Sequence, residues 1–156
     1  MIKNIIVTGK SKVNEISHEL KVPHVLISIQ GSTSNKMDRR PYLHPSVFRK
    51  AVLWLNFDDI DNYEEGFKTI SEEDAKRIIE FVEKYKDRDQ VEVILINCFA
   101  GISRSSAVAA AINYLYKINT YTDYFRDNRY FPNRLVYSTI LRVYYNQFKD
   151  KLPSEK

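Results

Sequence analysis

The sequence predicts an α/β fold in which a central, mostly parallel sheet is flanked by helices. The chain has 156 residues, of which 44% are hydrophobic and 28% are charged, a balance typical of a single globular domain. Short β-branched and aliphatic runs alternate with segments of helical spacing, the order that builds parallel sheets. The run at residues 24–29 is almost continuously apolar, which is typical of a strand covered on both faces. We therefore interpret residues 1–156 as one domain.

The first half of the chain predicts three strands and one helix. A β-branched run predicts the first strand at residues 4–8, and apolar positions at helical spacing predict a helix at residues 11–20. The second strand is expected at residues 24–29. Residues 30–46 are polar and show neither a helical nor a strand period, so they predict a surface loop that borders a site. The third strand, at residues 51–57, runs directly into two aspartates.

The second half begins with a loop at residues 60–70. Ser71 is followed by three acidic residues, which predicts an N-capped helix through residue 85. Residues 91–96 predict the fourth strand. Residues 104–116 predict a helix whose run of small side chains permits close packing.

The C-terminal part predicts a short helix at residues 121–127 and a last helix that begins near Pro132 and runs through about residue 149. In an open parallel sheet, ligands bind beyond the carboxyl ends of the strands. Asp58, Asp59 and Cys98 follow such ends. We therefore expect the functional site there.

The charge balance gives a mild bias toward anionic partners. Lys and Arg number 24 and Asp and Glu 20, a formal net charge of +4. Because the chain has no nucleic-acid motif and no basic tail, we expect no nucleic-acid partner. Arg39 and Arg40, the adjacent arginines, are interpreted as exposed charges in preference to contacts with an anionic substrate.

Other classes are excluded by what the sequence lacks. No window approaches the ~18 consecutive apolar residues of a membrane helix, and the start lacks a signal peptide's apolar stretch. The single cysteine, Cys98, excludes an intrachain disulfide and suits a reducing compartment, so we expect a cytoplasmic protein. The three histidines lack metal-ligand spacing, so no metal is expected. Because the sequence has no dinucleotide or nucleotide-triphosphate glycine motif, no other cofactor is expected.

The segment between the fourth strand and the next helix combines residues that suit phosphate binding. Five residues separate Cys98 from Arg104, and Ser105 follows the arginine. A loop that enters a helix can direct several backbone N–H groups at one point, with the helix dipole behind them. Arg104 adds a planar fork of donors that fits two phosphate oxygens. We therefore expect a phosphate cradle formed by Phe99, Ala100, Gly101, Ile102, Ser103 and Arg104.

The same donors stabilise a thiolate, which makes Cys98 a candidate nucleophile. Ser105 is placed to donate a hydrogen bond to that sulfur and to improve it as a leaving group. The alternative, an inert buried thiol, leaves the accompanying glycine, arginine and serine unexplained.

The loop from Cys98 to Ser105 resembles the signature loop of the cysteine-dependent protein tyrosine phosphatases: Cys, five residues, Arg, then Ser or Thr. Residues 55–60 and 131–133 extend the resemblance to compact, dual-specificity-like microbial members of this superfamily; matching is weak before residue 50. The resemblance implies a protein tyrosine phosphatase-like fold and a metal-free reaction through a cysteinyl-phosphate intermediate.

The resemblance also implies a general acid, an aspartate on a loop upstream of the nucleophile. Asp59 is favoured, because the residue just before Ile60 matches the family pattern. Asp58 remains the alternative, and one of the two is expected to serve the loop's own hydrogen bonds. Asp61 is the next candidate. Asn133, at the start of the last helix, is interpreted as a partner of the local backbone in preference to a residue that borders the pocket.

Two features depart from the family pattern. Asn97 stands where the family usually has His before the nucleophile; an amide can still hydrogen-bond to the loop but carries no positive charge. Asp59 lies 39 positions before Cys98, a long separation for the compact enzymes, with the excess assigned to residues 61–70.

The leading hypothesis is a phosphomonoester hydrolase, a protein tyrosine or dual-specificity phosphatase that acts as a monomer on a phosphorylated protein or a small phosphomonoester. The alternative is a phosphate-binding pseudophosphatase with little turnover, which the departure at Asn97 favours. A third reading, a rhodanese-like sulfurtransferase or an arsenate reductase, is disfavoured by the upstream aspartate and, for reductases related to low-molecular-weight phosphatases, by the loop's place in the second half of the chain.

Overall fold

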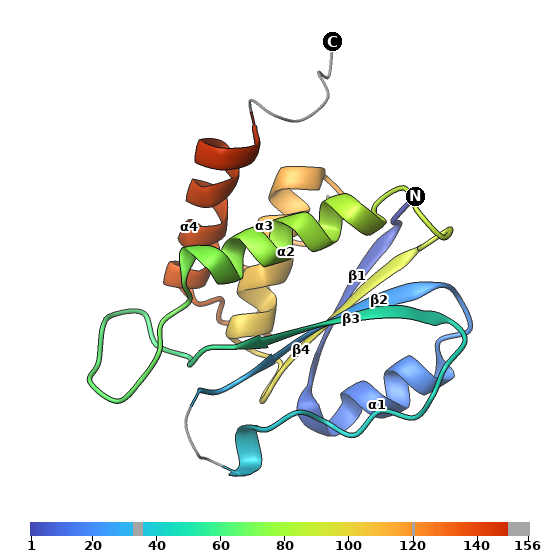
Figure 1. Cartoon of the computed structure of the whole chain (residues 1–156), viewed down its shortest axis with the longest axis horizontal. Helices are drawn as coiled ribbons and strands as arrows, with labels where there is room; N and C mark the ends of the chain where they lie inside the picture. Colours follow the sequence, from blue (N-terminus) through green and yellow to red (C-terminus); the bar gives the residue numbers. More distant parts are fainter. Residues whose placement is uncertain (33–35, 120, 150–156) are drawn as a thin grey trace.

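Four parallel strands form the central sheet of the computed structural model, which describes residues 1–32, 36–119 and 121–149 (Figure 1). The strands pair in the order β1-β4-β2-β3, and each pair is parallel. The predicted parallel sheet is therefore confirmed. Their bounds are β1 (Asn4–Gly9), β2 (His24–Gln30), β3 (Arg49–Asn56) and β4 (Val93–Cys98).

Helices cover both faces of the sheet. Helix α1 (Lys10–Glu19) lies on one face, whereas α2 (Glu72–Tyr85), α3 (Arg104–Tyr116) and α4 (Arg134–Val143) lie on the other (Figure 1). A π-helical turn, Tyr144–Phe148, continues α4. This arrangement explains why β2 and β4 are buried along their whole length, as expected of strands between two helical layers.

The strand residues alternate between two cores. In β4, Ile94 and Ile96 belong to the large core beneath α2, α3 and α4, while Leu95 between them belongs to the smaller core beneath α1. This alternation follows from the two-residue period of a strand. It fixes which way each side chain points at the carboxyl edge, where β4 ends with Cys98 and β1 ends beside it with Gly9.

Helix α2 begins as the sequence predicts. The Ser71 side chain accepts a hydrogen bond from the Asp74 N–H at 3.0 Å, and the Asp74 carboxylate accepts one from the Ser71 N–H at 2.9 Å. These two bonds form a capping box, which satisfies N–H groups that the first turn of a helix leaves unpaired.

The prediction of a helix at residues 121–127 is wrong, because this segment forms turns. The side chain of Asp123 accepts a hydrogen bond from the Phe125 N–H at 3.0 Å, and that of Asp127 accepts one from the Arg129 N–H at 2.9 Å. Such local bonds compete with helical ones. A seven-residue helix is also too short to be stable without strong packing.

The predicted start of the last helix is wrong by two residues. Pro132 precedes the helix, which begins at Arg134. Asn133 is the N-cap, and its side-chain oxygen accepts a hydrogen bond from the Val136 N–H at 3.1 Å. The predicted loop at residues 30–46 contains one 3₁₀ turn, Lys36–Asp38; its residues 33–35 lie outside the described residues. No helix in the described part of the chain is long and apolar enough to cross a membrane.

Candidate active site

Cys98 is the last residue of β4 and is 2% exposed. Its sulfur lies 3.1 Å from the hydroxyl oxygen of Ser105 and accepts a hydrogen bond from the Gly101 N–H at 3.3 Å. The structure thus brings together the cysteine, the loop backbone and the serine that the sequence analysis selected.

The loop that follows Cys98 is packed, backbone against backbone, on the end of β1. The Lys10 N–H donates a hydrogen bond to the carbonyl of Phe99 at 3.0 Å. Gly101 has a φ of +75°, and a Cβ built there would lie 2.5 Å from the backbone nitrogen of Gly9. Both the left-handed conformation and the lack of space require glycine at position 101.

The remaining loop residues face outward to different degrees. Phe99 and Ile102 are 43% and 45% exposed, and Ala100 is also exposed. Ser103 is half-buried and precedes α3. The rim of the loop therefore presents apolar side chains beside the polar interior.

Arg104 opens α3 with its side chain almost fully buried. Its Nη1 donates to the carbonyl of Phe57 at 2.9 Å, and its Nη2 forms an ion pair with Oδ2 of Asp38 at 3.1 Å. Its Nε is buried without a hydrogen-bond partner among the described residues. The guanidinium is thus anchored at two nitrogens and retains free donors.

Asp58 is engaged in the structure of its own loop. Its carboxylate accepts hydrogen bonds from the backbone and hydroxyl of Ser32 and, at 2.7 Å, from the Lys68 N–H. Burial opposes its ionisation, but the donors of Lys68 and Ser32 outweigh burial and lower the pKa of Asp58. The charge of Arg104 lowers that pKa further. Asp58 is therefore an ionised structural carboxylate.

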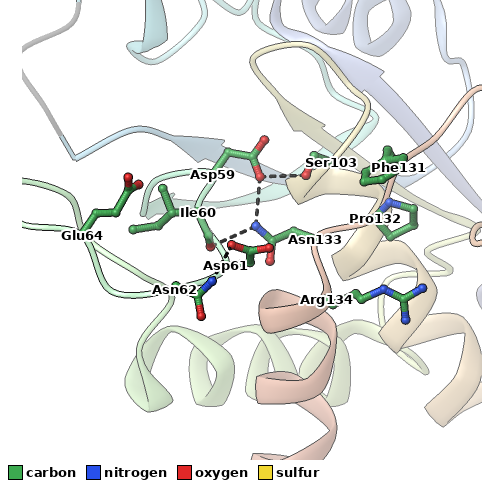
Figure 2. A pocket seen from close by; sticks show the side chains of 10 residues that line it. All are labelled: Asp59, Ile60, Asp61, Asn62, Glu64, Ser103, Phe131, Pro132, Asn133 and Arg134. Atoms are coloured by element: carbon green, nitrogen blue, oxygen red, sulfur yellow. Dashed lines mark hydrogen bonds between the residues drawn. The ribbon is translucent and has the colours of Figure 1, made fainter.

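Asp59 points instead toward Ser103, in the loop between Cys98 and α3 (Figure 2). Its Oδ1 accepts hydrogen bonds from the Ser103 hydroxyl at 2.7 Å and from the Asn133 side-chain amide at 3.0 Å. Asn133 also donates to the carbonyl of Ile60 at 3.1 Å. Both readings of Asn133 therefore hold, since it caps α4 and also borders the pocket.

A cavity of about 500 Å³ lies beside the loop (Figure 2). It shares Ser103 and Asp59 with the candidate site, whereas Cys98 does not line it. Asp61 is on its wall and accepts a hydrogen bond from the Asn62 side chain at 3.2 Å. The complete lining is Asp59, Ile60, Asp61, Asn62, Glu64, Ser103, Phe131, Pro132, Asn133 and Arg134.

Arg39 and Arg40, together with Asp38, line a second cavity of about 440 Å³. Both arginines are exposed, and the guanidinium of Arg40 lies over the ring of Trp54 at 4.5 Å from its centroid. This position agrees with the interpretation of the pair as exposed charges.

Asn97 hydrogen-bonds to the loop, as an amide at this position can. Its side-chain nitrogen donates to the carbonyl of Cys98 at 3.3 Å, and its side-chain oxygen is buried without a partner in the described ranges. In the same ranges, no group of three or more His, Cys, Asp or Glu residues is arranged to hold a metal ion.

Two contacts escape the sequence analysis. Asp38 reaches Arg104 from a polar loop without periodicity, and nothing in the local pattern marks it. Asn133 reaches Asp59 with the amide nitrogen that a helix cap leaves unused. Its position before a helix signals the cap but not the second contact.

The comparisons with known proteins show the fold. No family sequence model matches the chain, and no curated protein matches it in sequence. Among solved structures, the human tyrosine phosphatase-like serine/threonine/tyrosine-interacting protein is similar, with a TM-score of 0.53 and 21% identity over 86% of this chain and 83% of that one. PTPMT1 in complex with PI(5)P is also similar, with a TM-score of 0.51 and 12% identity over 92% and 94%. A second PTPMT1 structure has a TM-score of 0.50 and 16% identity over 92% and 94%. The chain therefore has the tyrosine phosphatase fold.

Proposed function

We propose that this chain is a cysteine-dependent phosphatase of the protein tyrosine phosphatase superfamily, which hydrolyses phosphomonoesters through a cysteinyl-phosphate intermediate. The observation that carries the proposal is the surroundings of Cys98. Its sulfur has the Gly101 N–H and the Ser105 hydroxyl beside it, at the base of a loop that leads into Arg104.

In the first step, the Cys98 thiolate attacks phosphorus, so that a P–S bond forms as the ester P–O bond breaks. Arg104 and the loop N–H groups stabilise the negative charge on the equatorial oxygens. The departing ester oxygen receives a proton from Asp59, which becomes ionised. The alcohol or phenol then leaves.

In the second step, water attacks the phosphorus of the cysteinyl-phosphate. Asp59 accepts the proton that the water loses, the P–S bond breaks, and Cys98 returns to the thiolate. Ser105 donates a hydrogen bond to the sulfur as this charge develops, which makes the thiolate a better leaving group. Inorganic phosphate is released.

Asp59 suits the acid role better than Asp58 on two grounds. Asp58 is buried and its carboxylate is saturated by N–H and hydroxyl donors that favour the ionised form. Asp59 is exposed and lies within hydrogen-bond distance of Ser103 in the phosphate-binding loop.

The substrate class is a phosphorylated protein or a small phosphomonoester. The structural similarity to PTPMT1 in complex with PI(5)P supports a phosphomonoester in general terms. Because the loop interior contains no lysine, highly charged phosphoinositides are disfavoured. We further propose a cytoplasmic, monomeric protein without a cofactor, in which the free thiol of Cys98 stays reduced.

A second candidate is a phosphate-binding pseudophosphatase. Asn97 supports it, because this residue supplies no positive charge beside Cys98, unlike the histidine usual in the superfamily. The two candidates differ in turnover and share the binding site.

Hydrolysis of p-nitrophenyl phosphate in the presence of EDTA tests the proposal, with tungstate binding measured by calorimetry in parallel. We expect turnover by the natural chain, and tungstate binding without turnover by Cys98→Ser, because a serine hydroxyl is not ionised near neutral pH. Tungstate binding without turnover by the natural chain would favour the pseudophosphatase. Turnover by Cys98→Ser at the natural rate would contradict the covalent mechanism.

A further inference from the structure

A buried ion pair connects the phosphate-binding loop to the turn after β2. Asp38 ends the 3₁₀ turn and contacts Arg104, the arginine assigned above to the phosphate. We propose that Asp38 is a positioning residue, which fixes the Arg104 guanidinium in the orientation that receives a phosphate oxyanion. The inference rests on the proposed function and deepens it.

The donors of Arg104 show what this orientation achieves. A guanidinium has five N–H groups in a rigid plane. One Nη1 donor is used on the carbonyl of Phe57, and one Nη2 donor on Asp38. Nε lies on the same edge of the plane as Nη2 and has no partner in the described part of the chain. Nε is therefore the donor on this edge that is left for a phosphate oxygen.

The unpartnered Nε points to a ligand. The Arg104 side chain is 6% exposed, and a buried donor without an acceptor is unfavourable. A phosphate oxygen would satisfy it. Anchors at Nη1 and Nη2 keep Nε directed at that place before the ligand arrives.

Asp38 is itself held by backbone contacts. Its carbonyl accepts a hydrogen bond from the Gly31 N–H at 3.3 Å, and Lys10 Nζ donates to the neighbouring carbonyl of Met37 at 2.9 Å. A Cβ at Gly31 would lie 2.6 Å from Oδ2 of Asp38. The Asp38 carboxylate therefore reaches Arg104 over a position that has no side chain.

Electrostatics alone and positioning make opposite predictions for Asp38. Removal of a carboxylate beside an anion site makes the site more positive, which by itself tightens binding of a dianion. Removal of the partner of a buried arginine also leaves that arginine without its fixed orientation. If Asp38 positions Arg104, its loss weakens oxyanion binding although the site gains positive charge.

The experiment measures tungstate affinity by calorimetry in the Cys98→Ser chain, where no turnover intervenes. We expect Asp38→Asn, which keeps the shape and loses the charge, to weaken tungstate binding by roughly tenfold and Asp38→Ala by up to roughly a hundredfold. Glu64→Gln is the matched control, because it removes a carboxylate from the wall of the neighbouring cavity, away from the Asp38–Arg104 pair; it should leave binding equal or slightly tighter.

Two further variants separate positioning from a general loss of structure. Gly31→Ala should weaken tungstate binding as Asp38→Asn does, because the new methyl group displaces the Asp38 carboxylate. In an Arg104→Ala background, Asp38→Asn should no longer weaken tungstate binding and should leave it equal or slightly tighter, because only the change in charge remains. Thermal unfolding of each variant verifies that it is folded.

Tighter tungstate binding by Asp38→Asn, matching Glu64→Gln, would overturn the inference and leave the proposed function intact. An equal loss in the Arg104→Ala background would also overturn it. Failure of the Cys98→Ser chain to bind tungstate would overturn the proposed phosphate site itself. Absence of turnover in the natural chain with intact tungstate binding would contradict only the catalytic proposal.

Discussion

The side-chain nitrogen of Asn133 donates a hydrogen bond to Oδ1 of Asp59 at 3.0 Å, although 74 positions separate the two residues. The oxygen of the same amide caps α4 through the Val136 N–H. One side chain thus connects the start of the last helix to the loop that carries the candidate acid.

Replacement of Asn133 separates these two roles. Asn133→Ser retains a good N-cap but is too short to hold Asp59, so the free energy of unfolding should change by only a few tenths of a kcal/mol while phosphotyrosine hydrolysis falls. Asn133→Ala should lose the cap as well, at a cost of ~0.5–2 kcal/mol. Chemical denaturation and kcat for phosphotyrosine check both variants. Unchanged phosphotyrosine kinetics in Asn133→Ser would show that Asp59 needs no support from this residue.

Asp59→Asn should reduce phosphotyrosine hydrolysis by ~10²–10⁴-fold. Its effect on p-nitrophenyl phosphate should be far smaller, because nitrophenolate leaves without a proton. The Asp59→Asn substitution should also abolish the basic limb of the pH–rate profile, if that limb reports ionisation of Asp59. Asp58→Asn is the matched comparison and should not show this dependence on the leaving group. An exchange of the two phenotypes would assign the acid to Asp58, and full activity of both would direct attention to Asp61.

Asp58 should instead contribute to stability in a pH-dependent way. The folded state lowers the pKa of Asp58, so its contribution is fully present above the carboxyl's ordinary pKa of ~3.9 and is lost as the pH falls through the lower folded value. The difference in free energy of unfolding between the natural chain and Asp58→Asn should therefore shrink between pH 6 and pH 3. Urea denaturation across this range measures it, and a constant difference would contradict the assignment.

Arg104→Lys should lower kcat/KM for p-nitrophenyl phosphate by at least ~10²-fold and should weaken tungstate binding. An ammonium carries the same charge, but it lacks the planar fork and cannot contact Phe57, Asp38 and two phosphate oxygens together. Steady-state kinetics and calorimetry measure the two losses. A kcat/KM in Arg104→Lys equal to that of the natural chain would show that a positive charge at position 104 is enough for hydrolysis.

Gly101→Ala should destabilise the fold more than Gly66→Ala does. Both glycines have positive φ, at +75° and +84°, but only the Cβ at position 101 meets backbone atoms, whereas nothing lies within 4 Å at position 66. Gly66→Ala should therefore cost ~1–2 kcal/mol from its backbone conformation, and Gly101→Ala should add an overpacking cost of ~1–3 kcal/mol. Thermal or urea unfolding compares them. Equal losses in the free energy of unfolding would show that the backbone around Gly101 shifts to accommodate the added methyl group.

Local patterns sufficed for the sheet and for the surroundings of Cys98. The alternation of apolar runs and helical segments reports burial directly, and the hydrogen-bond partners of Cys98 lie within seven positions of it. The helix expected at residues 121–127 failed because Asp123 and Asp127 bond to nearby backbone. The contacts of Arg104 with Asp38 and of Asn133 with Asp59 depend on how distant segments pack, which no local pattern records.

The strand order also implies which part of the candidate site unfolds locally first. Cys98 ends β4, which has a neighbour on each side, whereas the loop with Asp59 follows β3, which is paired only with β2 at the margin of the sheet. Edge strands exchange their amide hydrogens through local fluctuations, whereas central strands exchange them only when a larger part of the fold opens. Mild warming should therefore loosen the loop with the candidate acid Asp59, and with it the Phe57 carbonyl that anchors Arg104, before it disturbs the strand that ends with Cys98.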